Sequence, residues 1–186
     1  MSIVRAAKAG DICVLLMPEK AELIGLRRVQ ETLAQAFDGW IVPEVHITCQ
    51  RFNPEGIENI QAMLPAISAR IAKMLSFPIY SDGLTQLLAP FWQTHVLRWK
   101  VQETDAWTKF IEGLDEALRE NGLDLHYPHD RPFTCSALDL INPVQLDYAP
   151  QMMFPRYLFN ARKVVFSRIL GLNDFETLGT AELGPS

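Results

Sequence analysis

A short stretch of alternating residues, 44–52, carries the side chains best suited to chemistry in this sequence. It reads Glu-Val-His-Ile-Thr-Cys-Gln-Arg-Phe. Alternate side chains of a β-strand share a face, so His46 and Thr48 lie together while the apolar residues between them point into a core. An imidazole can transfer a proton near neutral pH, and a hydroxyl can hold an anionic oxygen. The stretch therefore predicts one half of a site for an anionic ligand.

A second stretch, 133–137, is the best candidate for the other half. It reads Phe-Thr-Cys-Ser-Ala, so small hydroxyl residues again alternate with apolar ones. When the two stretches are aligned, Ser136 matches Thr48 and Thr134 matches His46. This half has a hydroxyl but no imidazole. A slip of one residue in the alignment would turn both hydroxyls into the core.

These two stretches resemble the repeated motif of the two-histidine (2H) phosphoesterases, which include the 2′-5′ RNA ligase-like proteins and cyclic nucleotide phosphodiesterases. That motif is a tetrad, hydrophobic-His-hydrophobic-Thr/Ser, and it occurs twice. Residues 45–48 fit it in full, while residues 133–136 depart from it only at the histidine. The opening strand, the first helix and the final strand pair of the family resemble residues 12–17, 21–37 and 159–183. The resemblance therefore extends over nearly the whole chain.

The resemblance implies a fold and a division of roles. The fold is α+β, a single domain over residues 1–186, with two similar lobes of mixed, mainly antiparallel sheet, helices on the outer faces and a central groove. In this family one His acts as general base and the other as general acid, hydroxyls hold the phosphate, and neither metal nor cofactor is needed. By analogy His46 would transfer a proton, and Thr48, Thr134 and Ser136 would bind phosphate.

The missing second imidazole leaves the activity open. A threonine hydroxyl has no pKa near neutrality, so Thr134 can position phosphate but cannot exchange a proton as imidazole does. His129 could replace the imidazole if the loop before Thr134 folds back toward the groove, and His95 could do so if its strand face lines the groove. Without a replacement, a contribution of about 10²–10⁴-fold to the rate is lost.

Three functions are therefore compatible with the sequence. The first is binding, with weak or altered hydrolysis, of a 2′,3′-cyclic or related phosphodiester of a nucleotide or RNA end. The second is a non-catalytic nucleotide- or RNA-end-binding or regulatory module. The third is a relict groove in a protein that acts through a partner surface. The cations that could meet an anionic ligand are Arg51, Arg98, Arg156 and Lys163, and the sequence does not choose among them.

Composition favours a small ligand. The chain has 186 residues, 48% of them hydrophobic and 21% charged, as in an ordinary globular domain. Its net charge of −5 provides no basic field for a long duplex, so the expected partner is a small nucleotide or RNA-end phosphate. The three cysteines lack metal-ligand spacing and read as reduced core residues. No apolar run approaches the ~18 residues of a membrane span, so we expect a cytoplasmic protein. We also expect a monomer.

Hydrophobic periodicity predicts alternating strands and helices. The expected strands cover 11–17, 44–52, 77–89, 91–102, 133–137, 164–169 and 175–183, and the expected helices cover 21–37, 57–74 and 104–121. Pro65 should kink or divide the second helix. Prolines within 142–158 predict a loop, in which Met152, Met153 and Phe154 either pack into the core or form a flap over the groove.

Overall fold

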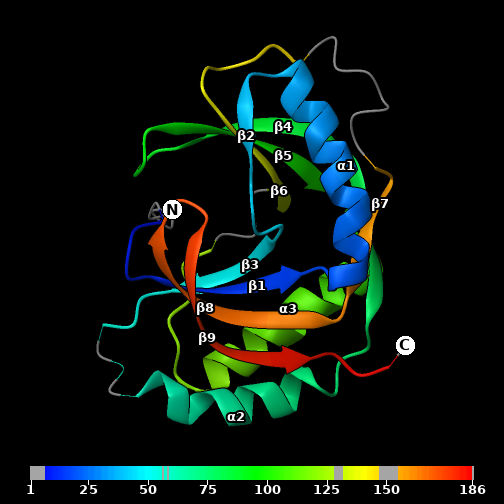
Figure 1. Cartoon of the computed structure of the whole chain (residues 1–186). Helices are drawn as coiled ribbons and strands as arrows, with labels where there is room; N and C mark the ends of the chain where they lie inside the picture. The colour runs from blue at the N-terminus through cyan, green and yellow to red at the C-terminus, as the bar shows by residue number, and fades with distance from the viewer. Residues whose placement is uncertain (1–6, 56, 58, 128–131, 147–154, 186) are drawn as a thin grey trace.

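The computed structural model describes residues 7–55, 57, 59–127, 132–146 and 155–185. Within these residues strands and helices alternate along the chain, as the periodicity predicts (Figure 1). In chain order the elements are β1 (Ile12–Met17), α1 (Lys20–Ala36), β2 (Gly39–Ile41), β3 (Ile47–Phe52), α2 (Ile60–Ile71), β4 (Phe77–Ala89), β5 (Thr94–Val101), α3 (Asp105–Glu120), β6 (Thr134–Leu140), β7 (Tyr157–Ala161), β8 (Lys163–Gly171) and β9 (Asp174–Glu182).

One continuous sheet organises the molecule. Its strand order is β7-β4-β5-β6-β3-β1-β8-β9, with β2 paired to β6. The pairs between these strands are antiparallel. The sheet is narrowest at its centre, where β3 and β6 share the single register pair Ile47 and Cys135. Figure 1 shows the strands on the two sides of this junction as two lobes, with β2, β4, β5 and β6 above and β1, β3, β8 and β9 below.

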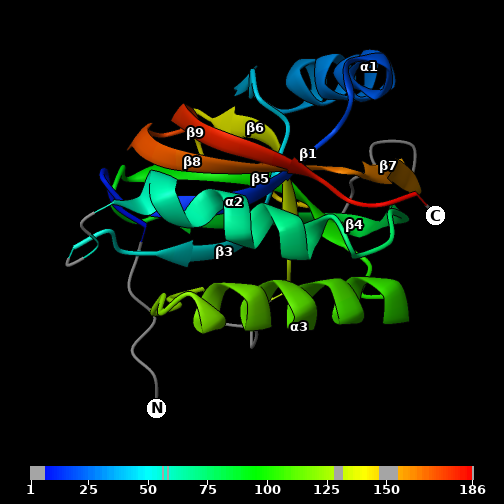
Figure 2. The ribbon, with the colours of Figure 1, turned by 90° about the horizontal axis from the view of Figure 1, so that it is seen from below.

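The helices cover the outer faces of the lobes. Helix α1 contacts β2 and β6, whereas α2 contacts β9 and α3. Figure 2 shows α1 on one side of the strands and α3 on the other. The predicted fold class is therefore confirmed: an α+β arrangement of two lobes with mainly antiparallel strands and outer helices.

Helix α3 follows its sequence signals closely. The Thr104 hydroxyl accepts a hydrogen bond from the backbone N–H of Trp107 at 3.3 Å, which caps the first turn. The helix ends before Asn121, and Gly122 then adopts a φ of +76°, a conformation that favours glycine after a helix. Its apolar stripe is buried, as the spacing predicts, and includes Trp107, Phe110, Ile111, Leu114 and Leu118.

Helix α2 continues through Pro65, so of the two expected effects, a kink or a division, the division is wrong. A proline lacks the N–H that would complete the helical hydrogen bond there. Buried residues on both sides of the proline, Leu64 and Ile67, belong to the main core and hold the two halves against it. Tertiary packing therefore outweighs the local preference for a break.

Two strands of the structure are absent from the prediction. β2 has only three residues, too few for a period of two to be recognised. β7 begins at Tyr157, inside the segment expected to be a loop, and pairs with the edge of β4. The Met152, Met153 and Phe154 run lies outside the described residues, so its place in the core or as a flap stays a prediction.

Candidate functional site

The centre of the sheet brings the two hydroxyl-bearing stretches together. The backbone N–H of Ser136 donates to the carbonyl of His46 at 2.9 Å, and Ile47 lies opposite Cys135. Antiparallel pairing then places Thr48 opposite Thr134. The register therefore pairs Thr48 with Thr134 and His46 with Ser136, whereas the motif alignment matched Thr48 with Ser136. Because Phe133 and Cys135 are buried in the core and Thr134 lines the cavity, the slip of one residue is excluded.

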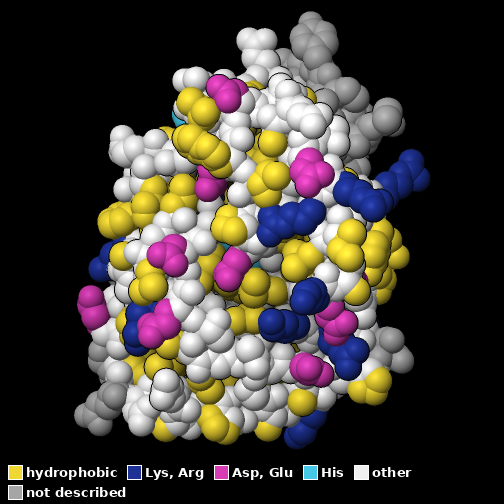
Figure 3. All heavy atoms as spheres, in the orientation of Figure 1, with side chains coloured by type: hydrophobic (Ala, Val, Ile, Leu, Met, Phe, Trp, Pro, Cys, Tyr) yellow, Lys and Arg dark blue, Asp and Glu magenta, His cyan; other side chains and the backbone are white. Residues whose placement is uncertain are grey.

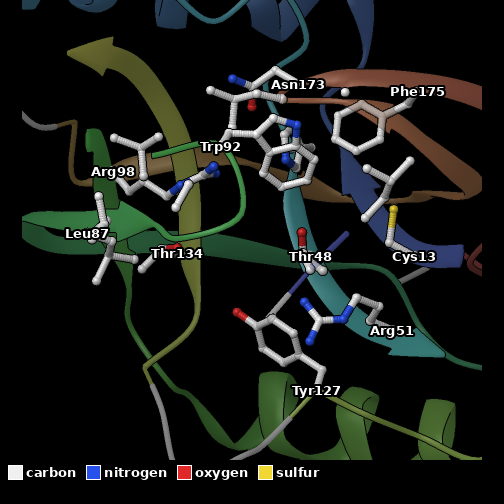
Figure 4. Close-up of a pocket in the computed structure, with 18 residues that line it drawn as sticks. Cys13, Thr48, Arg51, Leu87, Trp92, Arg98, Tyr127, Thr134, Asn173 and Phe175 are labelled. Atoms are coloured by element: carbon white, nitrogen blue, oxygen red, sulfur yellow. The ribbon is translucent and has the colours of Figure 1, made fainter. Parts of the chain in front are cut away.

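A cavity of about 190 Å³ lies between the lobes at this junction (Figure 4). One part of its wall is polar, and another part is apolar. The polar lining includes His46, Thr48, Arg51, Arg98, Tyr127 and Thr134. The apolar lining includes Leu87, Leu88, Trp92, Val96, Ile169 and Phe175. Such a cavity suits a ligand with an anionic group and a flat or apolar substituent.

His46 is held in one orientation just before β3. Its side chain is only 2% exposed, and its Nδ1 lies 2.7 Å from the carbonyl oxygen of Glu44. A carbonyl can only accept, so Nδ1 carries the proton of the neutral ring and Nε2 keeps the lone pair. The ring also meets the edge of Phe175, with ring centroids 5.0 Å apart. His46 is therefore arranged to accept a proton at Nε2.

The surroundings of His46 keep its imidazole neutral. Burial, and secondarily the positive charge of Arg98, lower its pKa from 6.5 to about 3, while the bond to the Glu44 carbonyl opposes the shift. An anionic ligand in the cavity would favour the imidazolium and raise this pKa. Proton uptake by His46 is therefore coupled to the arrival of negative charge.

This pKa shift predicts acid sensitivity of the fold. Because the pKa of His46 is lower in the folded chain than in the unfolded one, its contribution to stability is complete above pH 6.5 and is lost as the pH falls toward 3. In that window it should lower the free energy of unfolding by up to about 1.4 kcal/mol per pH unit. Urea unfolding at several pH values should show this component in the native chain and not in His46→Asn, whose amide can still donate to Glu44.

His95→Asn, which alters an imidazole outside the cavity, is the control for this pH dependence. Identical pH profiles of the native chain and His46→Asn would contradict the assignment.

Ser136 has a different place from the one expected of a phosphate ligand. It is 0% exposed and is not among the residues that line the cavity. Its Oγ accepts from the backbone N–H of His46 at 2.9 Å and lies 3.3 Å from both the Glu44 carbonyl oxygen and Nδ1 of His46. Because the hydroxyl contacts His46 and Glu44, Ser136 positions His46 and the tautomer whose Nδ1 proton is donated to the Glu44 carbonyl.

Removal of the Ser136 hydroxyl should destabilise the fold. In Ser136→Ala the buried N–H of His46 loses its acceptor, which costs about 1–3 kcal/mol. Thr134→Val is the matched control, since it removes a hydroxyl of the same strand that faces the cavity. Chemical denaturation gives the free energy of unfolding of the two variants. An equal decrease in both would argue against the positioning role of Ser136.

Arg98 is the cation that the structure brings to the site. It lies on β5 opposite Ser136, is half-buried, and points into the cavity (Figure 4). Burial lowers the pKa of Arg98, and the nearby Tyr127 and Asp139 oppose this shift. The guanidinium still carries its charge, because arginine is not deprotonated in proteins. Within the described residues its guanidinium makes no hydrogen bond or ion pair. A charged group of this kind is suited to an anion from solution.

The other three candidate cations lie elsewhere or are already paired. Arg51 lines the cavity, but it is buried and its Nε lies 3.7 Å from Oδ2 of the buried Asp11. Arg156 and Lys163 are exposed and are not lining residues.

Tyr127 completes the polar side of the cavity. Its backbone N–H donates to Oε1 of Gln50 at 2.9 Å, and the preceding N–H of His126 donates to the Arg51 carbonyl at 2.7 Å. Its ring stacks on Phe133 with centroids 5.7 Å apart. His126 and Tyr127 are therefore fixed to β3, with the tyrosine side chain directed at the site.

Of the two proposed substitutes for the second imidazole, His95 does not line the cavity. Val96 and Arg98 line it, so the alternating side chain of His95 faces the other side of β5, where its Nδ1 is buried without a partner. His129 lies outside the described residues, and its role stays a prediction. Thr134 does line the cavity, in the place where a second histidine was sought.

Several cavity residues were missed by the sequence analysis. Trp92, Asn173 and Tyr127 come from turns and loops, where no periodicity marks a face, and Phe175 comes from the start of β9. Trp92 falls within the stretch 91–102 that was expected to be a strand, whereas the structure begins β5 at Thr94 and places Trp92 in the turn before it. All three cysteines are free and buried in apolar clusters, as predicted, and Cys13 also lines the cavity.

No helix among the described residues is long and apolar enough to cross a membrane. The same residues contain no cluster of His, Cys, Asp and Glu side chains that could hold a metal ion.

Comparisons with known proteins find similarity in structure only. No family model matches the sequence, and no curated protein matches it. A solved structure described as a phosphoesterase superposes with a TM-score of 0.62 at 11% identity, covering 95% of this chain and 99% of that one. TT0787 of Thermus thermophilus gives 0.62 at 17% identity, with 92% and 97% covered. LigT of E. coli in complex with 3′-AMP gives 0.60 at 12% identity, with 95% and 99% covered.

This chain therefore has the fold of the two-histidine phosphoesterases. The resemblance inferred from the two tetrads is confirmed at the level of the fold. Its second tetrad departs from the two-histidine pattern at one position, because Thr134 stands where the second imidazole is expected.

Proposed function

We propose that the protein binds the phosphate of a small nucleotide or an RNA end in the cavity between its lobes. The proposal rests mainly on Arg98, a half-buried charge that points into the cavity and makes no hydrogen bond or ion pair among the described residues. Thr48 and Thr134, opposite each other, supply hydroxyls on the same wall. The crystallisation of LigT, which shares the fold, with 3′-AMP and with NADP+ supports a nucleotide ligand.

We further propose slow hydrolysis of a 2′,3′-cyclic or related phosphodiester, with His46 as the proton carrier. A water molecule would attack phosphorus and pass its proton to Nε2 of His46, the bond from phosphorus to one ribose oxygen would break, and that oxygen would take a proton from solvent. Arg98 would offset the charge that develops on the phosphoryl oxygens. Because Thr134 stands in the place of the second imidazole that would protonate the leaving oxygen, the rate should be about 10²–10⁴-fold below that of a complete site.

A non-catalytic binding or regulatory module is the alternative. Two observations favour it: the hydroxyl of Thr134 in place of an imidazole, and the low pKa of His46, which makes its ring a weak base in the empty site.

The surface supports a small ligand rather than a long duplex. On the face seen in Figure 3, Lys and Arg side chains are interspersed with Asp and Glu. The net charge is −5. A long polyanion binds through many simultaneous basic contacts, which this distribution does not favour. That the protein is a cytoplasmic monomer stays a prediction.

One experiment separates the two candidate functions. The native chain and His46→Ala are assayed for hydrolysis of a panel of 2′,3′-cyclic nucleotides and of a cyclic-phosphate-ended oligonucleotide, and binding of the same ligands is measured directly. Turnover that His46→Ala abolishes would support hydrolysis with one proton carrier. Binding without turnover would identify a recognition module, and no binding to the native chain would overturn the proposal.

A further inference from the structure

We propose that two contacts close the groove across the lobes, so that the cavity takes a mononucleotide or a terminal nucleotide and excludes the interior of a continuous strand. The contacts are the packing of Trp92 on the opposite lobe and the hydrogen bonds between Asn173 and Asp139. This inference rests on the proposed function, which it makes more specific.

The first contact comes from the turn between β4 and β5. Its backbone directs Trp92 back over the sheet: the N–H of Trp92 donates to Ala89 at 3.2 Å, and the Trp92 carbonyl accepts from the Thr94 hydroxyl at 3.1 Å. Gln93 adopts a φ of +55° at this turn, a conformation that few residues other than glycine adopt. The turn therefore holds the indole in a defined place.

The Trp92 ring lies against the other lobe. A second apolar cluster, separate from the main core, gathers on the inner face of β1 and β8, and Trp92 and Phe175 pack against it. Figure 4 shows the indole above Thr48, between Arg98 on one side and Phe175 on the other. The cluster consists of Cys13, Leu15, Val165 and Ile169.

The second contact joins the turn between β8 and β9 to β6. Nδ2 of Asn173 lies 2.8 Å from Oδ1 and 2.7 Å from Oδ2 of Asp139. Asn173 has a φ of +54°, which asparagine tolerates better than most side chains. Asp139 is on the upper lobe and Asn173 on the lower, so these hydrogen bonds also span the groove.

The interior of an RNA strand can bind in a groove only if the chain enters at one end and leaves at the other, whereas a terminal nucleotide needs only one opening. The two contacts cross the groove beside Arg98 and Phe175, where a strand would have to pass. The cavity of about 190 Å³ is also smaller than the ~300–1,000 Å³ of sites for drug-sized ligands. It has room for a phosphate and part of a nucleoside, with Trp92 as an apolar wall for the base.

Binding of two ligands tests the preference. The dissociation constants of a nucleoside 2′,3′-cyclic monophosphate and of a circular oligoribonucleotide, which has no ends, are measured for the native chain and for the double variant Trp92→Ala/Asn173→Ala. The native chain should bind the mononucleotide at least about tenfold more tightly, a difference of about 1.4 kcal/mol. The double variant should lose most of this ratio. Equal affinities in the native chain, or an unchanged ratio in the double variant, would overturn the proposal.

Trp40→Ala is the matched control for the binding test, because Trp40 is an exposed tryptophan of β2 that does not line the cavity. It should keep the native ratio of affinities, and a ratio as low as in the double variant would overturn the role of Trp92.

A ligand-free measurement separates this inference from the proposed function. Cys13 lines the cavity, is buried and belongs to the apolar cluster on which Trp92 packs, whereas Cys49 and Cys135 belong to the main core. Alkylation by iodoacetamide is measured separately for each cysteine-containing peptide. Cys13 should react about tenfold faster in the double variant than in the native chain, which corresponds to a free energy of opening lower by about 1.4 kcal/mol. The core thiols should react slowly in all variants, which shows that the fold is intact.

Equal rates of Cys13 alkylation in the native chain and the double variant would overturn the proposed closure, independently of the ligand-binding results. Absence of any nucleotide binding to the native chain would overturn the proposed function and the ligand preference with it, while the Cys13 rates would still report whether the groove is closed.

Discussion

Thr134→His should raise the rate of 2′,3′-cyclic nucleotide hydrolysis by about 10²–10⁴-fold, the typical contribution of one general acid or base. Thr134 lines the cavity on β6, and antiparallel pairing places it opposite Thr48 of β3. An imidazole at this position would share the cavity with His46 and could protonate the leaving oxygen while Nε2 of His46 accepts the proton of water. The cavity of about 190 Å³ gives the larger side chain space.

Two further variants control the gain in rate. Thr134→Gln places a polar side chain of similar size at the same position but transfers no proton near neutral pH, so its rate should stay at the native level. Adding His46→Ala to Thr134→His should remove the gain, because both proton carriers are then needed. A correctly folded Thr134→His variant that binds the nucleotide without any increase in rate would show that the missing imidazole does not limit the activity.

Arg98→Gln should weaken binding of a nucleoside cyclic monophosphate by about 30-fold or more, because truncating one partner of a buried charge pair costs about 2–5 kcal/mol. Arg98 points into the cavity and makes no ion pair within the described residues, so its charge is available to the ligand. The same variant should raise the pKa of His46, since the charge of Arg98 is one cause of its lowering. Isothermal titration gives the affinity, and an NMR titration of the imidazole gives the pKa.

Lys100→Gln is the matched control for the charge of Arg98. Lys100 is the next residue on the same face of β5, but it does not line the cavity, so its loss should change the affinity little. Arg98→Lys should fall between the native chain and Arg98→Gln, because it keeps the charge and loses the two-pronged geometry. Similar losses in Lys100→Gln and Arg98→Gln would indicate a general effect of charge instead of a contact with phosphate.

The sequence predicts the centre of the sheet well, because both central strands alternate strictly. Val45, Ile47 and Cys49 are fully buried, and Thr48 faces the cavity. A period of two also fixes the register, since a slip of one residue would exchange the buried and cavity faces. The closing pair of strands, β8 and β9, is predicted for the same reason.

The cavity wall is harder to predict because it depends on contacts between distant parts of the chain. On β5 both faces carry polar side chains, His95 on one and Arg98 on the other, so the alternation alone does not show which face lines the cavity. β1 is apolar throughout, which is typical of a strand buried on both faces and hides the fact that Cys13 meets the cavity. Trp92 and Asn173 depend on turns with positive φ at or beside them, which no simple motif marks.

The most direct test of the central claim compares a nucleoside 2′,3′-cyclic monophosphate with the same nucleoside lacking phosphate, titrated into the native chain and into Arg98→Gln. We predict that the cyclic monophosphate binds the native chain clearly more tightly than the nucleoside, and that Arg98→Gln removes most of this difference. Equal binding of the two ligands to the native chain, or an undiminished preference in Arg98→Gln, would contradict a phosphate site at this cavity.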